Sequence, residues 1–164
     1  MDYTFQRRGD GRLIYQLHFE PPYCDNYDYW VSLMTHYLSR SDMMEIHCWT
    51  EESEVIEELE SVLENSYEAV VESNITIFKV KTTPEVIHHL LTANIGKEGE
   101  IKWFSIFLSK NNKTVFHSEH WGKEFFAPDV NEEEIAFITS VMPKETNFHQ
   151  YQASDVDLVW EMEE

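Results

Sequence analysis

Hydrophobic and polar residues alternate strictly near the start of the chain, and this period of two predicts a strand with one buried face. One face carries apolar residues and the other carries mainly polar ones: Leu13, Tyr15, Leu17 and Phe19 against Ile14, Gln16, His18 and Glu20. A Gly-Asp-Gly turn at 9–11 connects this strand to residues 2–8, so the pattern predicts an N-terminal hairpin. Pro21 and Pro22 end it.

Apolar residues recur with helical spacing in four later segments, 25–39, 53–64, 84–95 and 131–142. At the start of each segment, or just before it, stands a residue that commonly caps a helix N-terminus: Asp25, Ser53, Thr83 and Asn131. Proline follows Thr83, and Glu134 takes the capping-box position after Asn131. Four helices are therefore expected.

Further strands are predicted between the helices. Residues 42–49 would bury Met44, Ile46 and Cys48, and the β-branched segment 75–81 forms another strand. A second hairpin joins 101–109 to 114–121 through a Lys-Asn-Asn-Lys turn. Residues 67–74 suit a helix or a strand equally well.

Two hairpins plus single strands, with helices between them, predict an α+β fold with a mostly antiparallel sheet and about four helices. The length of 164 residues, with no internal repeat, fits a single domain over 1–164. Within it, the polar residues 144–154 are predicted to be a loop. Residues 155–164 alternate again, as expected of an edge strand or of a tail that orders on binding.

The composition is that of a globular protein, 42% hydrophobic and 14% aromatic. The sequence shows no secretory signal and no apolar run long enough to cross a membrane, so a cytoplasmic location is expected. Cys24 and Cys48 are then expected to be reduced, with Cys48 in the core, although the sequence alone leaves a bridge between them open.

The chain is strongly acidic, with 31 Asp and Glu against 12 Lys and Arg and a net charge of −19. This charge disfavours direct binding to nucleic acid or to anionic membranes and favours a basic protein partner. Residues 41–78 contain eleven acidic residues and no Lys or Arg. The candidate partner-binding carboxylates are Glu51, Glu52, Glu54, Glu57, Glu58, Glu60 and Glu64. An ordinary solvated helix face would look similar.

Aromatic residues in the segment Pro-Pro-Tyr-Cys-Asp-Asn-Tyr-Asp-Tyr-Trp (21–30) add candidate anchors for such a partner. Trp30 lies on the apolar stripe of the first helix, so it is expected in the core. Tyr23 and Tyr29 lie off that stripe and are predicted to be exposed contact residues.

The motif His-Ser-Glu-His, residues 117–120, resembles a metal chelate, but in a strand His117 and His120 point to opposite faces. Three histidine–glutamate pairs do share a face within their own strands: His18 with Glu20, Glu45 with His47, and His117 with Glu119. If those strands were neighbours, the side chains would form a metal or acid–base site. The alternative is a solvated polar face.

The chain contains no GxSxG, Walker A, GxGxxG, HExxH or EF-hand motif, and the sequence indicates no cofactor. The leading hypothesis is a non-enzymatic protein that binds a basic partner, for example an inhibitor or immunity-type protein against a cationic nuclease. Alternatives are a small metal-assisted enzyme, a nucleic-acid mimic, or a protein whose role leaves no local signature. The sequence does not indicate an oligomeric state.

Overall fold

A computed structural model describes residues 13–152, which form one eight-stranded antiparallel sheet and four helices. The predicted α+β class is confirmed. The strands are β1 (Tyr15–Glu20), β2 (Met43–Trp49), β3 (Tyr67–Glu72), β4 (Ile75–Lys81), β5 (Ser105–Lys110), β6 (Lys113–Glu119), β7 (Glu124–Val130) and β8 (Asn147–Gln152). The helices are α1 (Asp28–Leu38), α2 (Ser53–Leu63), α3 (Pro84–Thr92) and α4 (Glu132–Val141).

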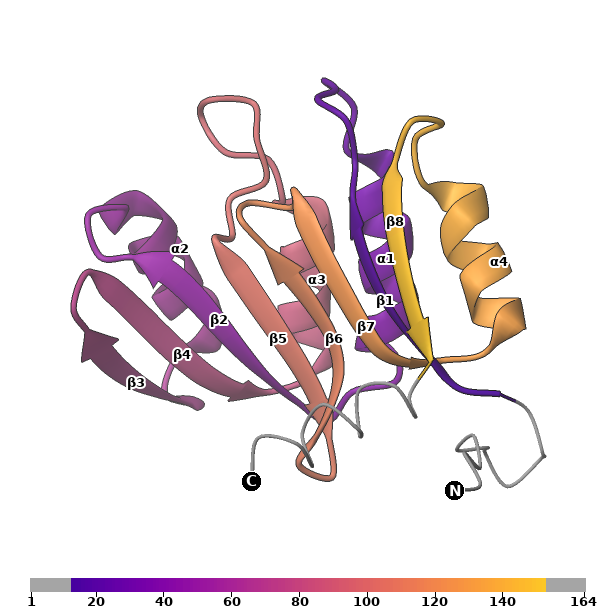
Figure 1. Cartoon of the computed structure of the whole chain (residues 1–164). Helices are drawn as coiled ribbons and strands as arrows, with labels where there is room; N and C mark the ends of the chain where they lie inside the picture. Colours follow the sequence, from indigo (N-terminus) through magenta and orange to yellow (C-terminus); the bar gives the residue numbers. More distant parts are fainter. Residues whose placement is uncertain (1–12, 153–164) are drawn as a thin grey trace.

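The strands lie in the order β3-β4-β2-β5-β6-β7-β1-β8, and every neighbouring pair is antiparallel. The helices cover one face of this sheet, with α1 packed against α3 and α4, and α2 against α3 (Figure 1). The sheet thus has one face buried under helices and a second face that no described helix covers. We call the second face the open face.

The core lies between the sheet and the helices and is rich in aromatic rings. Phe125 is stacked with Phe19 and Phe116 at centroid distances of 5.1 and 5.9 Å, and Tyr37 of α1 stacks on Phe116 at 4.1 Å. Trp30 is fully buried, as expected, and its indole Nε1 donates a 2.9 Å hydrogen bond to Ser118 Oγ on β6. The bond satisfies a donor that burial would otherwise leave without a partner.

Two of the four predicted helix caps are confirmed. The Thr83 side chain accepts a hydrogen bond from Val86 N, and the Asn131 side chain accepts one from Glu134 N. Asp25 and Ser53 are not caps: α1 begins at Asp28, three residues later, and Ser53 is the first helical residue of α2. Asn26 Oδ1 instead accepts from Asp28 N, so a local turn displaces the start of α1.

The sheet contains strands that the periodicity did not predict. Residues 67–72, ambiguous in sequence, are β3, and β7 was not predicted at all. The predicted loop at 144–154 is wrong, since β8 occupies Asn147–Gln152 and pairs with β1 along its whole length. Backbone hydrogen bonds to β1 hold β8, so its side chains need no apolar alternation, and of its residues only Phe148 packs on the core.

Tight turns connect the hairpins. Asn111 and Asn112 both have positive φ, as a two-residue type I′ turn requires, so the predicted Lys-Asn-Asn-Lys turn is confirmed. After β6 the chain turns through Gly122, whose φ is +76°, and a Cβ added there would lie 2.8 Å from Ile101 and 3.0 Å from Trp30. Only glycine fits this close approach.

The predicted N-terminal strand at 2–8 and the segment 155–164 lie outside the described residues. Within residues 13–152, none of the helices combines the length and the apolar character that a membrane span requires. Cys24 and Cys48 are both free thiols, and Cys48 is buried as predicted.

Candidate functional site

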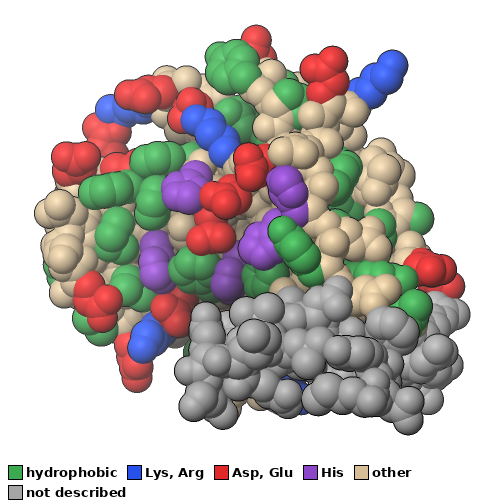
Figure 2. All heavy atoms as spheres, viewed as in Figure 1, with side chains coloured by type: hydrophobic (Ala, Val, Ile, Leu, Met, Phe, Trp, Pro, Cys, Tyr) green, Lys and Arg blue, Asp and Glu red, His purple; other side chains and the backbone are tan. Residues whose placement is uncertain are grey.

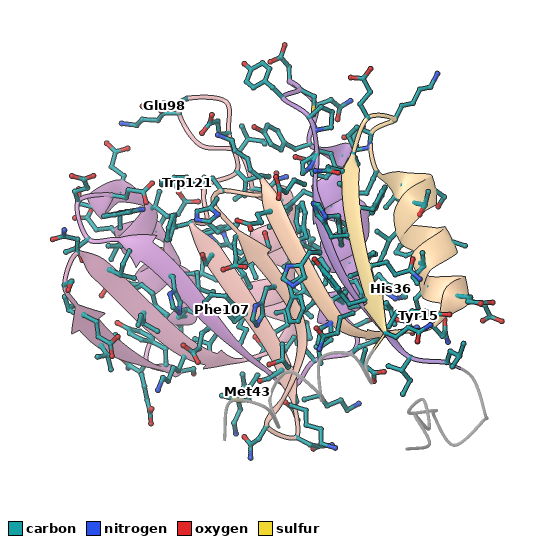
Figure 3. The ribbon with its side chains drawn as sticks, in the orientation of Figure 1. Tyr15, His36, Met43, Glu98, Phe107 and Trp121 are labelled. Atoms are coloured by element: carbon teal, nitrogen blue, oxygen red, sulfur yellow. The ribbon has the colours of Figure 1, made fainter. Side chains whose placement is uncertain are left out.

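The open face of the sheet gathers most of the side chains that the sequence offers for chemistry or binding. Strand register places Phe107 opposite both Glu45 and His117, and it places Phe126 opposite both His117 and His18. Alternation within each strand puts these side chains on the same face, away from the helices. Figure 3 shows Phe107 near the middle of this face.

Aromatic and imidazole rings run in contact across the open face from β2 to β8. The centroid distances are 4.7 Å from His47 to Phe107, 4.4 Å from Phe107 to His117, and 5.5 Å from His117 to Phe126. The series continues at 4.4 Å from Phe126 to His18 and at 6.2 Å from His18 to Tyr151. We call these six residues the ring row.

Carboxylates accompany the ring row on the same face. Figure 2 shows histidine and acidic side chains interspersed with hydrophobic ones over the central strands. By register these acids are Glu20, Glu45, Glu119 and Glu124. The solvated face of an antiparallel sheet normally carries polar residues, so the contiguous rings are unusual for a surface that meets only water.

His117 lies at the centre of the ring row and is held neutral at pH 7. Burial lowers its pKa to about 4, with a further lowering by His18 and His47 that Glu45 partly offsets. Burial also lowers the pKa of His18. The centre of the open face therefore presents neutral imidazoles between phenyl rings, and the acids around it set the local charge.

Glu119 and Glu124 lie opposite each other on β6 and β7. Burial raises the pKa of Glu119, and the neighbouring Glu124 raises it further. His120, just after β6, contacts Glu124 at 2.6 Å and lies outside the ring row. His117 and His120 thus have different partners, in keeping with the expectation that they do not chelate one ion together.

The three predicted histidine–glutamate pairs do lie on one face, but their strands are not neighbours. β5 separates β2 from β6, and β7 separates β6 from β1, so successive pairs are about 10 Å apart. Phe107 and Phe126 fill the intervening positions. Among residues 13–152, no three His, Cys, Asp or Glu side chains converge closely enough to hold a metal ion.

The acidic helix α2 is partly neutralised by lysines from the following segment. Glu54 accepts a 2.6 Å hydrogen bond from Lys97 Nζ, and Glu58 accepts one of 2.8 Å from Lys102 Nζ. His89 Nε2 also lies 3.6 Å from Glu58. Two carboxylates of the predicted partner-binding surface, Glu54 and Glu58, are therefore already paired with lysines.

The other candidate carboxylates differ in their surroundings. Glu52 is half-buried and accepts a hydrogen bond from Trp49 N, and burial raises its pKa. Four are exposed and make no ion pair within residues 13–152: Glu51, Glu57, Glu60 and Glu64. Of these, Glu60 accepts a hydrogen bond from the Tyr67 hydroxyl. α2 therefore keeps a smaller acidic surface than the sequence suggested.

The two tyrosines predicted to be exposed contact residues differ in solvent exposure. Tyr23 is 86% exposed, as predicted, but Tyr29 is only 5% exposed, so that prediction is wrong. The Tyr29 ring packs edge-on to Phe125, and its hydroxyl donates a 3.0 Å hydrogen bond to Gly122 O. Burial raises the pKa of Tyr29, and the residue serves the core.

Sequence reasoning missed Phe107, Phe126 and Tyr151 as members of the site. Phe107 and Phe126 received no role from the sequence, and Tyr151 lay in the predicted loop 144–154. The available signal was the alternation of side chains along a strand. Phe107 lies between the core residues Ile106 and Leu108, so its side chain points to the opposite face of the sheet.

Comparison with known proteins adds no relative, since no family model, no curated protein and no solved structure matches this chain.

Proposed function

We propose that this protein is a non-enzymatic binding protein that engages a basic protein partner through the open face of its sheet. The observation that supports the proposal most directly is the ring row itself, a continuous series of partly or fully exposed rings from β2 to β8 with carboxylates beside it. An inhibitor or immunity-type role against a cationic enzyme is one concrete form.

The composition of the face matches what protein interfaces use for affinity. Aromatic side chains dominate binding energy because they bury a large area with little loss of conformational entropy. Phe107 and Phe126 already pack against neighbouring rings, which fixes their orientation before binding. A partner that covers them gains hydrophobic burial without ordering a mobile surface.

The charge of the molecule selects the partner. With a net charge of −19, the chain attracts a cationic surface over a long range and repels an anionic one. Glu20, Glu45, Glu119 and Glu124 lie beside the rings, where Lys or Arg side chains of a docked protein would meet them. The exposed acids of α2 contribute to steering rather than to contact.

The test is affinity capture from an extract of the cells that express the protein, comparing the wild-type chain with Phe107→Ser and Phe126→Ser. The proposal predicts that the wild type retains a protein of high isoelectric point, that salt weakens the complex, and that each variant binds about tenfold more weakly or worse.

Tyr23→Ser is the matched control, since Tyr23 is an exposed aromatic residue outside the ring row. It is expected to bind like the wild type. Circular dichroism and thermal unfolding show whether each variant is folded. A partner that is acidic, or one that Phe107→Ser and Phe126→Ser retain fully, would contradict the proposal.

A further inference from the structure

β3 is the outermost strand of the sheet at one end, and within the described residues it has a neighbour, β4, on one side only (Figure 1). Five of its six residues are exposed, including Val70 at 44% and Val71 at 61%. It contains no proline, no lysine and no bulge in its register with β4. Those are three of the usual devices that keep another strand from pairing with an edge.

The hairpin geometry identifies the backbone groups that point outward. β3 and β4 are joined by the two-residue turn Ser73-Asn74, so the flanking pair Glu72–Ile75 exchanges both of its backbone hydrogen bonds. Such pairs alternate with non-bonded ones along an antiparallel ladder. The N–H and C=O groups of Tyr67, Ala69 and Val71 therefore point away from β4, where an added strand would bond them.

The side chains beside this edge favour a basic strand. Glu68, Val70 and Glu72 lie on the open-face side of β3, and Ala69 and Val71 lie on the other side. An added strand with Lys or Arg at alternate positions would place cations opposite both glutamates and apolar residues opposite Ala69 and Val71. Lys79 of β4 lies opposite Glu68 and offsets part of its charge, so Glu72 is the stronger of the two sites.

The same charges disfavour a second copy of this chain at the edge. In an antiparallel pair of β3 strands centred on Val70, with the helices of both copies on one side, Glu68 of each copy would oppose Glu72 of the other. Like charges directly opposite in a sheet are destabilising. In this register, the glutamates of β3 therefore oppose pairing with a second copy.

We propose that the β3 edge accepts an extended basic segment of a partner protein, which adds to the sheet as a further strand beside β3. Backbone hydrogen bonds to Tyr67, Ala69 and Val71 provide the pairing, and Glu68 and Glu72 select the charge. The inference rests on the proposed function for the basic character of the partner, and it adds a mode of recognition separate from the ring row.

The test uses a capped six-residue peptide of alternating lysine and valine, with the corresponding glutamate–valine peptide as its charge control. Nuclear magnetic resonance of the full chain follows amide exchange at Ala69 during titration. The expected result is at least tenfold slower exchange at Ala69 with saturating lysine peptide, and no binding of the glutamate peptide.

Ala69→Pro removes one outward donor and leaves the bonds to β4 in place, because proline is tolerated on the free side of an edge strand. Ala69→Pro should lower the affinity for the lysine peptide about tenfold. Ala69→Ser keeps the N–H and should bind the peptide like the wild type. Val71→Pro is a second variant with the same expected effect, in case Ala69→Pro does not fold.

Three outcomes would overturn the inference: unchanged exchange at Ala69, equal peptide binding by the proline and serine variants, or concentration-dependent dimerisation that Ala69→Pro abolishes. The proposed function is judged separately. If Phe107→Ser loses the captured partner while Ala69→Pro retains it, the ring row stands and the edge does not.

Discussion

Gly122 lies where the turn after β6 passes between Trp30 and Ile101, with a positive φ that other residues adopt only under strain. We predict that Gly122→Ala lowers the free energy of unfolding by about 2–4 kcal/mol, because the left-handed conformation and the overlap with Trp30 and Ile101 both oppose a Cβ. Urea unfolding measures the loss.

Gly99→Ala is the matched control for Gly122. Gly99 also has a positive φ, +80°, but nothing lies within 4 Å of an added Cβ. Gly99→Ala should lower the free energy of unfolding by only about 1–2 kcal/mol. Equal losses at the two glycines would show that packing against Trp30 contributes nothing.

Ser118 carries the one hydrogen bond that the structure gives to the buried Trp30 indole. Ser118→Ala should cost about 1–3 kcal/mol, because it leaves a buried N–H without an acceptor. Ser118→Thr keeps the hydroxyl and separates that loss from a change in packing. Thermal unfolding of both variants measures the difference, and a fully stable Ser118→Ala would mean that the bond adds no stability.

His117 makes stability depend on pH in a defined direction. Its folded pKa of about 4 lies below the unfolded value of 6.5, so the native state stays neutral while the unfolded chain takes up a proton. Stability is therefore lost as the pH falls from 6.5 toward 4. The contribution is about 1–2 kcal/mol, allowing for screening by solvent at a half-exposed site.

His117→Phe removes the group whose pKa differs between the folded and unfolded states, and with it this proton-linked loss of stability. Urea unfolding at pH 7 and pH 4.5 should show a smaller decrease for His117→Phe than for the wild type. An identical decrease in the two proteins would mean that His117 titrates normally in the folded state.

At the scale of the element, the helix ends separate useful signals from misleading ones. Asn131 and Thr83 accept backbone hydrogen bonds as their sequences predict, but Ser53 does not, because α2 begins at Ser53 itself. A capping residue in a sequence fixes a helix start only when that residue itself takes an extended conformation, as Thr83 and Asn131 do.

Two substitutions test this difference between the helix starts. Asn131→Ala should cost about 1 kcal/mol, since it removes the acceptor for Glu134 N. Ser53→Ala should change stability by less than about 0.5 kcal/mol, because no cap bond is lost. Chemical unfolding measures both, and a larger loss at Ser53 than at Asn131 would refute the assignment of the caps.

Strands were harder to predict than helices, and the reason is physical. β1, β2 and β4 have one face in the core, so the pattern revealed them. Among residues 13–152, β8 and β3 are the outermost strands and have mostly exposed side chains. Backbone pairing stabilises them, β8 with the distant β1 and β3 with the adjacent β4. Backbone pairing leaves little trace in side-chain periodicity.

At the scale of the whole molecule, the site depends on strand order, which a single sequence does not encode locally. The alternation of side chains along each strand was enough to predict that His18, His47 and His117 point away from the core. Their separation by Phe107 and Phe126 followed only from the insertion of β5 and β7 between their strands. Because of this strand order, the histidines alternate with phenylalanines in the ring row instead of meeting at a candidate metal site.

Long-range folding also changed the acidic surface. Lys97 and Lys102, more than forty residues downstream of their partners, reach Glu54 and Glu58. Residues 41–78 contain no Lys or Arg of their own, so the sequence of this segment alone could not show that lysines after α3 pair with two of its glutamates. The net charge of −19 is unaffected by this pairing, and so is the expectation of a basic partner.

Hydroxyl-radical footprinting of the complex with the captured basic partner tests the central claim most directly, because it reports the solvent accessibility of individual side chains. The account predicts that Phe107, Phe126 and Tyr151 lose reactivity on binding while Tyr23 keeps its own. Protection of Tyr23 with unchanged reactivity at Phe107 and Phe126 would contradict it and place the partner elsewhere on the molecule.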